Sequence, residues 1–295
     1  MREEKRNIYL LMASFVVTEI LALVFANNII ISQIPVEMYE PFGNENVVQA
    51  GANSGLLIVS VVLFTLFLIA VIKLGFRIIF RIVAVGMPVA FLLLFLLMQI
   101  EIISFNIFNF SADVANILAA LAIAYVAVVV YAIWKGLTTV TMTGFMLATS
   151  LIAAYLAVSI APPTLFVLPV AFALYDVYAV FRGPLRTLIK VMPLKQKKVI
   201  RSEKQKRAAI AEMHKQLGLM AARIGGFTIG AGDFTFYSML VAAAYVLKGL
   251  LSALAVGVAI NAGVVLTLWI LQRYQKPLPG LPIPIFLGIA TMILI

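Results

Sequence analysis

Two aspartates of this sequence stand where paired carboxylates could carry out acid–base chemistry. Asp176 lies six residues before Arg182 at the end of one apolar run, and Asp233 lies ten residues after Arg223 at the start of the next. With a helical rise of about 1.5 Å per residue, the two acids would lie roughly 9 and 15 Å inside the same side of a membrane. A carboxylate at such a depth costs roughly 2.5–3.5 kcal/mol by insertion scales and therefore indicates a functional site.

Paired carboxylates at this depth could hydrolyse a peptide bond. Two such groups a few ångströms apart do not both ionise readily, so one of them keeps a proton. The ionised member can take a proton from water while the protonated member polarises a peptide carbonyl, as in aspartic proteases. Gly230 and Gly232 stand just before Asp233, and without side chains they would let an extended substrate approach and add as a strand. We therefore predict Asp176 and Asp233 as a catalytic pair and the two glycines as substrate-binding residues.

The same inventory of residues argues against metal and thiol chemistry. The sequence has one histidine, His214, and no cysteine, and it contains no His-Glu-x-x-His motif. One histidine cannot supply the ligands of a zinc site or the base of a buried Ser–His pair. Without cysteine there is neither a thiol nucleophile nor a disulfide framework. We expect no metal and no cofactor, and we interpret His214, which lies in a basic polar stretch, as a solvated side chain.

The elements that must position the two acids are membrane-spanning helices. The chain is 64% hydrophobic and 12% charged with a mean hydropathy of +1.11, whereas soluble domains average about 25% charged residues. A helix needs about 20 residues to cross the ~30 Å hydrocarbon layer. Nine apolar runs meet or approach this length: 8–32, 54–74, 82–103, 114–134, 138–160, 164–182, 224–247, 250–271 and 280–295. The predicted fold class is an all-α polytopic membrane protein with nine transmembrane helices.

Basic residues predict the orientation of these spans, because Lys and Arg remain on the cytoplasmic side near span ends. Across the nine spans, all of the 22 Lys and Arg residues except Lys248 fall on one side. This distribution predicts a cytoplasmic N-terminus and an outside C-terminus in a multi-pass protein of the cell membrane. The net charge of +10 follows from the same distribution, so it is not evidence for nucleic-acid binding. The run 8–32 is too long for the apolar core of a signal peptide, and we interpret it as a retained first span.

The spans group into two blocks that flank a basic segment. Residues 1–182 hold transmembrane helices one to six, with Asp176 on the sixth, and residues 224–295 hold helices seven to nine, with Asp233 on the seventh. Residues 183–223 form a basic cytoplasmic loop between them. The start of this loop is amphipathic at helical spacing and suits the membrane interface, through Leu185, Leu188, Ile189 and Met192.

A proline-rich segment before the last span is the second feature expected near the acids. Residues 275–284 contain four prolines and Gly280, a composition that cannot continue a helix. Non-helical backbone at membrane depth persists only where it is buried in protein or lines water. The segment enters from the predicted cytoplasmic side, where both acids lie, so we favour a role in the site over that of a rigid connector.

Glu19 is a further acid within an apolar run, near the middle of the predicted first span. It could be part of a proton pathway, or it could be a neutral glutamic acid hydrogen-bonded to another helix, and we favour the second interpretation. In the eighth predicted span, Ala253 and Gly257 stand four residues apart, a spacing of small residues that is compatible with close helix packing.

Three short motifs resemble those of the presenilin and signal peptide peptidase family of GxGD intramembrane aspartyl proteases. They are Tyr175-Asp176, Gly230-Ala231-Gly232-Asp233 and Pro279-Gly280-Leu281. These are similar to the family's Tyr-Asp, Gly-x-Gly-Asp and Pro-Ala-Leu motifs, in the same order and on the same spans. The nine-span plan and the N-in orientation are similar to presenilin, and the size and brief loops are most similar to archaeal presenilin homologues. The resemblance implies an intramembrane aspartic endopeptidase.

The resemblance also implies roles for single residues and partners. Asp176 and Asp233 would be the catalytic pair, and the substrate-binding residues would be Tyr175, Gly230, Gly232, Pro279, Gly280 and Leu281. Gly280 stands where the family usually has alanine, and glycine loosens the loop. The partners would be transmembrane peptide or protein substrates and the lipid bilayer. Presenilin needs accessory subunits whereas signal peptide peptidases act alone, so accessory subunits and a homo-oligomer both stay open.

Two other functions share part of this pattern. Prepilin peptidases also carry Gly-x-Gly-Asp, but their motif usually continues with a basic residue two positions after the Asp, where Thr235 stands here, and they lack the proline loop. An ion-coupled transporter or channel could use intramembrane acids and proline-broken helices, and Glu19 is its best support. Against transport, the two halves of the chain show no internal repeat, and Asp176 and Asp233 lie on adjacent spans near one side.

Overall fold

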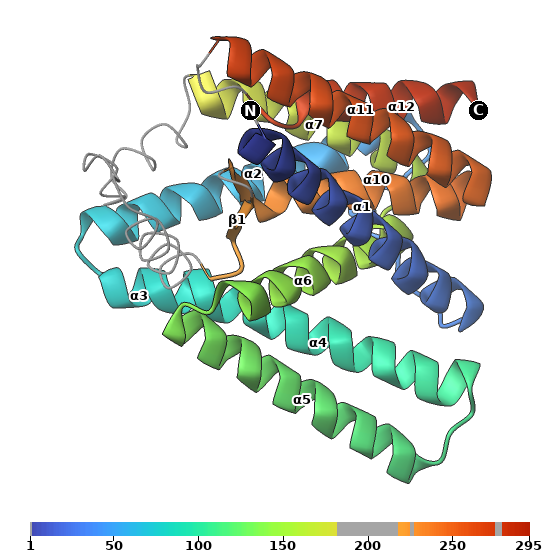
Figure 1. Ribbon diagram of the computed structural model, residues 1–295. Helices are drawn as coiled ribbons and strands as arrows, with labels where there is room; N and C mark the ends of the chain where they lie inside the picture. The colour runs from blue at the N-terminus through green and yellow to red at the C-terminus, as the bar shows by residue number, and fades with distance from the viewer. Residues whose placement is uncertain (1, 182–217, 225–226, 275–278) are drawn as a thin grey trace.

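The computed structural model describes residues 2–181, 218–224, 227–274 and 279–295. Within these ranges the chain forms nine helical segments (Figure 1). They are α1 (Arg2–Ile31), α2 (Val47–Lys73), the continuous run of α3 (Arg77–Arg81), η1 (Ile82–Gly86), α4 (Met87–Glu101) and η2 (Ile102–Ile107), then α5 (Ala112–Lys135), α6 (Thr138–Ser159), α7 (Pro162–Phe181), α10 (Ala231–Lys248), α11 (Leu250–Tyr274) and α12 (Pro282–Leu294). Seven of these segments are long and apolar enough to cross a membrane. The predicted all-α polytopic membrane fold is confirmed.

The seventh predicted span is wrong at its start. It was expected to be helical from residue 224, but α10 begins at Ala231, and the preceding residues form the strands β1 (Ala221–Ile224) and β2 (Phe227–Gly230). The strands are antiparallel, with Ala221 opposite Gly230. Two consecutive glycines at 225–226 disfavour a helix, and the β-branched Thr228 and Ile229 favour a strand. The depth of ~15 Å for Asp233 assumed a continuous helical rise and is therefore wrong as well, because Asp233 lies in the first turn of α10.

Helix α10 lies at the centre of the helix bundle. It packs against α1, α6, α11 and α12 (Figure 1). Six of its side chains are fully buried: Phe234, Met239, Leu240, Ala242, Ala243 and Ala244. The small residues let neighbouring backbones approach closely. The element that carries Asp233 is thus fixed by packing along most of its length.

Helix α6 is rich in Thr and Ser. It is nevertheless the most buried of the seven helices that are long and apolar enough to cross a membrane. Its hydroxyls donate to carbonyls one turn earlier on the same helix, as Thr149 does to Phe145 and Ser150 does to Met146. Such bonds satisfy the hydroxyls inside the helix. The polar composition therefore does not prevent α6 from packing between α1 and α10.

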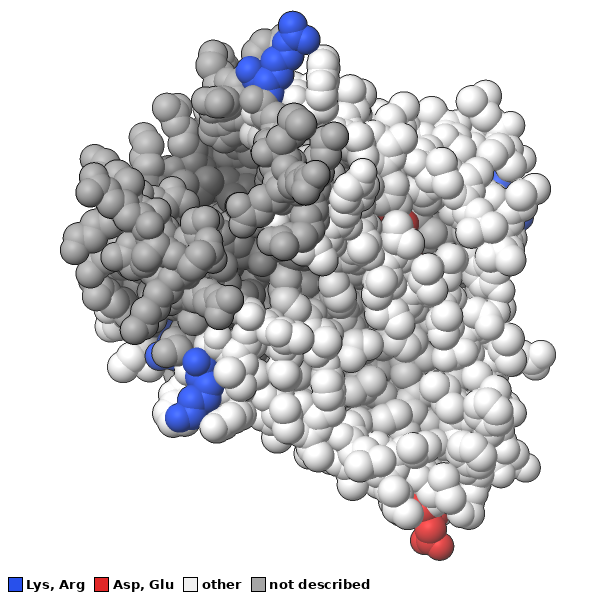
Figure 2. All heavy atoms as spheres, viewed as in Figure 1, with Lys and Arg blue, Asp and Glu red and all other residues white. Residues whose placement is uncertain are grey.

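The outer surface of the bundle is apolar, as a multi-pass membrane protein requires. Figure 2 shows a face that is uncharged over its centre, with basic and acidic side chains mostly at its margins. Lys248, the basic residue that departs from the predicted charge distribution, ends α10 and donates from Nζ to the carbonyl of Met292 in the last turn of α12 over 2.7 Å. This bond satisfies a carbonyl that the end of a helix leaves free, which gives Lys248 a structural reason to stand there.

Candidate active site

The first of the two acids meets the residues that precede the last helix. Asp176 lies near the C-terminal end of α7 and is half-buried. Its Oδ2 accepts a hydrogen bond of 3.1 Å from the backbone N–H of Leu281. A backbone donor stabilises negative charge on the carboxylate. The proline-rich segment, of which residues 275–278 lie outside the described residues, therefore reaches the site through Leu281.

The second acid meets the neighbouring residue of the same segment. A Cβ atom added to Gly280 would lie 3.1 Å from Oδ1 of Asp233 and 3.3 Å from its Cγ, so the Gly280 backbone lies directly against this carboxylate. Asp176 on α7 and Asp233 on α10 thus meet at two consecutive residues, Gly280 and Leu281. The structure therefore brings both predicted acids to the same dipeptide.

Aromatic side chains fix the position of Asp233. Phe234, the next residue, is fully buried, and its ring stacks on Phe15 of α1 with the centroids 4.1 Å apart. Phe145 of α6 meets the same ring edge-on at 5.0 Å. Aromatic pairs of these geometries contribute about 0.5–1.5 kcal/mol each beyond the area that they bury. The start of α10 is therefore held from two sides.

Tyr237 is a residue of the site that the sequence interpretation missed. Its hydroxyl donates to the carbonyl of Gly280 over 2.8 Å, and its side chain is 3% exposed. It stands four residues after Asp233, so both side chains lie on one face of α10. That spacing was the available signal, but it does not by itself say which segment the hydroxyl would meet.

The other predicted site residues surround the pair to different degrees. Gly230 is the N-cap of α10 with an extended backbone, and a Cβ atom added to Gly232 would meet no atom within 4 Å. Among the described residues, open space therefore lies beside Gly232, the residue before Asp233. The Tyr175 hydroxyl is buried without a hydrogen-bond partner among the described residues. Pro279 is half-buried and directly precedes Gly280.

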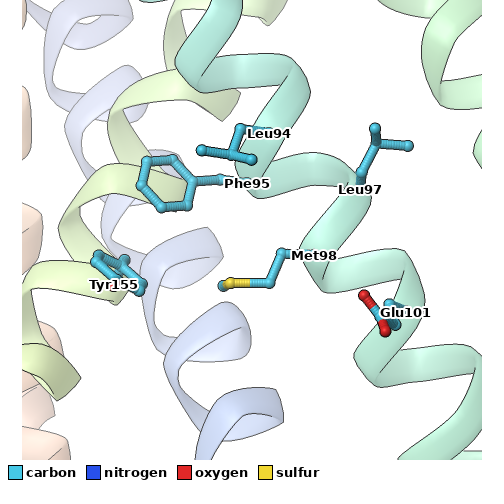
Figure 3. Close-up of a pocket in the computed structure, with 6 residues that line it drawn as sticks. All are labelled: Leu94, Phe95, Leu97, Met98, Glu101 and Tyr155. Carbon is cyan, nitrogen blue, oxygen red and sulfur yellow. The ribbon is translucent and has the colours of Figure 1, made fainter. Parts of the chain in front are cut away.

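A groove of about 360 Å³ lies elsewhere on the molecule, between α4 and α6 (Figure 3). It is lined by Leu94, Phe95, Leu97, Met98, Glu101 and Tyr155. None of the predicted site residues contributes to it. Across the described parts of the chain, no three His, Cys, Asp or Glu side chains gather closely enough to hold a metal ion.

The fold and these acids define a class: a polytopic α-helical membrane protein with two aspartates paired beside a loop. Residues 193–295 match the family model for presenilin. Presenilin-B of Dictyostelium discoideum is 35% identical over 128 residues, 43% of this chain and 24% of that protein. A presenilin-like protein of Arabidopsis thaliana is 43% identical over 72 residues, which are 24% of this chain and 18% of that protein. The matched part of the chain thus spans less than a quarter of the length of these curated relatives.

Solved structures extend the similarity to the whole fold. A presenilin family intramembrane aspartate protease, solved in two space groups, superposes with TM-scores of 0.63 and 0.62 at 19% and 20% identity. The two superpositions cover 97% and 96% of this chain and 97% and 94% of the solved chains. This chain therefore has the fold of that protease, and the match of residues 193–295 to the presenilin model bears out the resemblance to presenilin.

Proposed function

We propose that this protein is an intramembrane aspartyl protease that hydrolyses peptide bonds of transmembrane helical substrates. The observation that carries the proposal is the meeting of Asp176 and Asp233 at Gly280 and Leu281. Two acids that share one proton beside a non-helical segment are the arrangement that acid–base hydrolysis of a peptide requires. The protein would act in the cell membrane with its N-terminus in the cytoplasm, as its basic residues predict.

The reaction follows from the shared proton. The ionised carboxylate removes a proton from water as the water oxygen attacks the carbonyl carbon of the scissile bond. The protonated carboxyl gives its proton to the carbonyl oxygen, and a tetrahedral diol forms. The diol then collapses: the carboxyl that took the proton of water gives it to the leaving nitrogen, the other, now ionised, carboxylate removes a proton from a diol hydroxyl, and the C–N bond breaks. An amine and a carboxylic acid leave, and the pair again holds one proton.

Each of the two acids has a feature that stabilises negative charge on its carboxylate. Asp176 accepts the Leu281 N–H, and Asp233 stands in the first turn of α10, where the helix dipole favours an anion. Neither feature assigns the proton to one carboxyl. The base and the acid are therefore roles of the pair.

An extended substrate fits the surroundings of Asp233. β2 ends at Gly230 and pairs with β1 in a two-stranded sheet of the described residues. A substrate segment that adds to the sheet would be unwound from its helix and would expose its carbonyls to the pair. Gly230 and Gly232 would let its backbone pass, and Tyr175, Pro279, Gly280 and Leu281 would complete the substrate site. Accessory subunits or a second copy of the chain could assist.

Proteoliposomes test this function against ion transport, the main alternative. The liposomes hold a single-span substrate and an ion-sensitive dye, with wild-type protein or Asp233→Ala. The proposal predicts cleavage by the wild type, none by Asp233→Ala, and no ion flux. Ion flux without cleavage would overturn it in favour of transport. If the wild type releases no product, binding of a transition-state analogue of aspartic proteases supports the proposal and indicates a missing subunit, and absence of binding counts against it.

A further inference from the structure

A second buried acid site lies apart from the catalytic pair, between α1 and α11. Glu19 is 5% exposed, and Asn261 donates from Nδ2 to its Oε2 over 2.8 Å. The same nitrogen donates over 2.8 Å to the carbonyl of Gly257, one turn earlier on α11. A hydrogen bond between Glu19 and another helix, favoured on sequence grounds, is confirmed, with Asn261 as the donor. The chemistry of this pair is not used by the proposed hydrolysis.

Two oxygens of this polar pair have no partner. Oε1 of Glu19 and Oδ1 of Asn261 are buried, and neither has a hydrogen bond to any described residue. Rotating the Asn261 amide does not help, because its two N–H groups are already used and its oxygen would then face the Gly257 carbonyl. With an ionised Glu19, both orphaned atoms are acceptors, and a buried unsatisfied acceptor costs about 1–3 kcal/mol.

A proton on Glu19 would give both oxygens a partner. A protonated carboxyl has a donor and an acceptor, so it can pair with an amide through two parallel hydrogen bonds. The proton on Oε1 would donate to Oδ1 of Asn261 while Oε2 accepts from Nδ2. An ionised Glu19 would instead be a buried charge that needs a cation.

Lys248 and Arg273, the basic residues of α10 and α11, stand in the last turns of their helices. The elements packed against α1 carry Glu101 on α4, Tyr155 on α6, Arg223 on β1, Asp233, Tyr237, Tyr245 and Lys248 on α10, and Arg273 and Tyr274 on α11. Arg273 is twelve residues from Asn261, which is ~18 Å along α11. Lys248 is seven residues from Val241, the α10 residue beside Gly257, which is ~10 Å. Because Lys248 and Arg273 lie this far along α10 and α11, neither is a cation partner for Glu19, and the neutral form of Glu19 is favoured in the middle of the bundle.

The acid–amide pair stands where α1, α10 and α11 meet, and α10 is the helix that carries Asp233. Gly257 is close to both Glu19 and Val241, since a Cβ atom added to it would lie 3.4 Å from Oε2 and 3.7 Å from a Val241 methyl. Phe15 lies one turn before Glu19 on the same face of α1 and stacks on the ring next to Asp233. A shift of α1 against α11 would therefore reach the aromatic cluster that fixes Asp233.

We propose that Glu19 is a positioning residue that holds one proton. Through its acid–amide pair with Asn261 it locks α1 to α11 next to α10, the helix that carries Asp233. Loss of that proton at alkaline pH leaves a charge and an unpaired amide oxygen in the bundle and loosens the contact. The protonation of Glu19 is independent of the protease activity. Its effect on cleavage rests on the proposed function.

Infrared spectroscopy tests the proton directly and needs no activity. The parent is Asp176→Asn/Asp233→Asn, which removes the proton shared by the catalytic pair. Adding Glu19→Gln should remove the C=O band of one protonated carboxyl at neutral pH. Adding Glu101→Gln, a matched change at an exposed acid on α4, should remove a carboxylate band instead. Loss of a carboxylate band with Glu19→Gln would overturn the proposal.

Thermal unfolding tests the lock. A native state that binds one proton more than the disrupted state loses stability as pH rises. Because glutamine keeps the neutral pairing without the proton, the wild-type Tm should fall relative to that of Glu19→Gln from neutral to alkaline pH, by about 2–4 °C for one lost interaction. Asn261→Leu should lower Tm throughout. Parallel Tm curves for wild type and Glu19→Gln would contradict the lock.

The pH dependence of cleavage tests the positioning role. On the alkaline side the wild type loses both the proton shared by the catalytic pair and the proton of Glu19, whereas Glu19→Gln loses only the first. The kcat of Glu19→Gln should therefore fall less steeply at the alkaline end than that of the wild type, with KM unchanged. Alkaline limbs of equal slope, with the proton established by infrared, would reduce Glu19 to a structural contact and overturn this role. A wild type without any cleavage would count against the protease proposal and leave the infrared and Tm results standing.

Discussion

Asp233 and Asp176 are held by different parts of the molecule. Asp233 begins the central helix, and the fully buried Phe234 beside it stacks on α1 and meets α6. Asp176 lies on a helix whose adjacent side chains face outward, with Leu174 59% and Tyr178 57% exposed. Its carboxylate is bonded to the N–H of Leu281, ahead of α12. One acid is thus positioned by the core and the other by a loop.

This difference indicates which substitutions should affect folding and which should affect cleavage. Packing fixes Asp233 with energies typical of a buried aromatic cluster. Asp176 instead accepts a backbone hydrogen bond from Leu281, and such a bond contributes about 1.5–3 kcal/mol when one partner is charged. Changes to the buried aromatic side chains around Asp233 should therefore affect folding as well as cleavage. Changes in the loop should affect cleavage alone.

The largest effect on cleavage is expected from filling the open space beside Gly232, the residue before Asp233. Gly232→Leu should reduce cleavage to background, because the new side chain would occupy the space where a substrate backbone passes. The protein should still fold, since a Cβ atom at Gly232 meets nothing within 4 Å. Gly55→Leu on α2, where the added Cβ is equally free, is the control in a cleavage assay. Wild-type turnover by Gly232→Leu would refute the substrate role of this glycine.

Removing the ring next to Asp233 should destabilise the whole protein. Phe234→Ala deletes a fully buried aromatic side chain, a change that typically costs about 3–5 kcal/mol. Leu174→Ala, beside Asp176 but 59% exposed, should cost less than about 1 kcal/mol. Thermal unfolding in detergent measures both. Equal losses of stability would mean that core packing supports Asp176 as much as it supports Asp233, which contradicts the difference between the two acids.

Removing the hydroxyl that holds the loop should lower the rate without unfolding the protein. Tyr237→Phe deletes the hydrogen bond to the Gly280 carbonyl, worth about 0.5–1.5 kcal/mol, so kcat should fall by up to about tenfold. Tyr245→Phe is a matched control, because its hydroxyl bonds Asn27 near the other end of α10. Steady-state kinetics should show the loss for Tyr237→Phe only. Equal rates in the two variants would remove Tyr237 from the site.

The smallest effect is expected from a single methyl group in the loop. Gly280→Ala, the residue usual in the family, would place Cβ 3.1 Å from Oδ1 of Asp233, so the carboxylate must move by a few tenths of an ångström. A displacement worth about 1 kcal/mol or less would lower kcat up to about fivefold. Gly86→Ala, with open space around its Cβ, controls for the substitution itself. An unchanged kcat for Gly280→Ala would show that the dipeptide does not press on Asp233.

Much of the fold could be predicted because membranes restrict sequences strongly. Apolar runs of spanning length gave the helices α1 to α7 within a few residues at most ends, and the acids stood out because charges are rare in such runs. The hairpin before α10 could not be derived from hydropathy, since Phe227 to Gly230 is as apolar as a helix would be. The two consecutive glycines at 225–226 are the local signal in the sequence.

The supporting contacts of the site depended on tertiary structure. The motifs around Asp176, Asp233 and Gly280 are local in the sequence and were found. The stacking of Phe15 on Phe234 joins residues more than two hundred positions apart, and the pairing of Glu19 with Asn261 is equally distant. No spacing rule connects residues on helices whose neighbours are unknown. The loop 183–223, with its amphipathic start and His214, is mostly outside the described residues, and those predictions stay untested.

The most direct test of the paired acids is cleavage of a single-span substrate by purified protein in detergent, beside Asp176→Asn and Asp233→Asn. The account predicts product from the wild type, none above background from either variant, and similar Tm values for all three, because an uncharged asparagine relieves the cost of a buried acid. Wild-type activity should fall on both sides of an acidic-to-neutral optimum, since the pair must hold one proton. Cleavage by either folded asparagine variant at a rate near that of the wild type would contradict the pair.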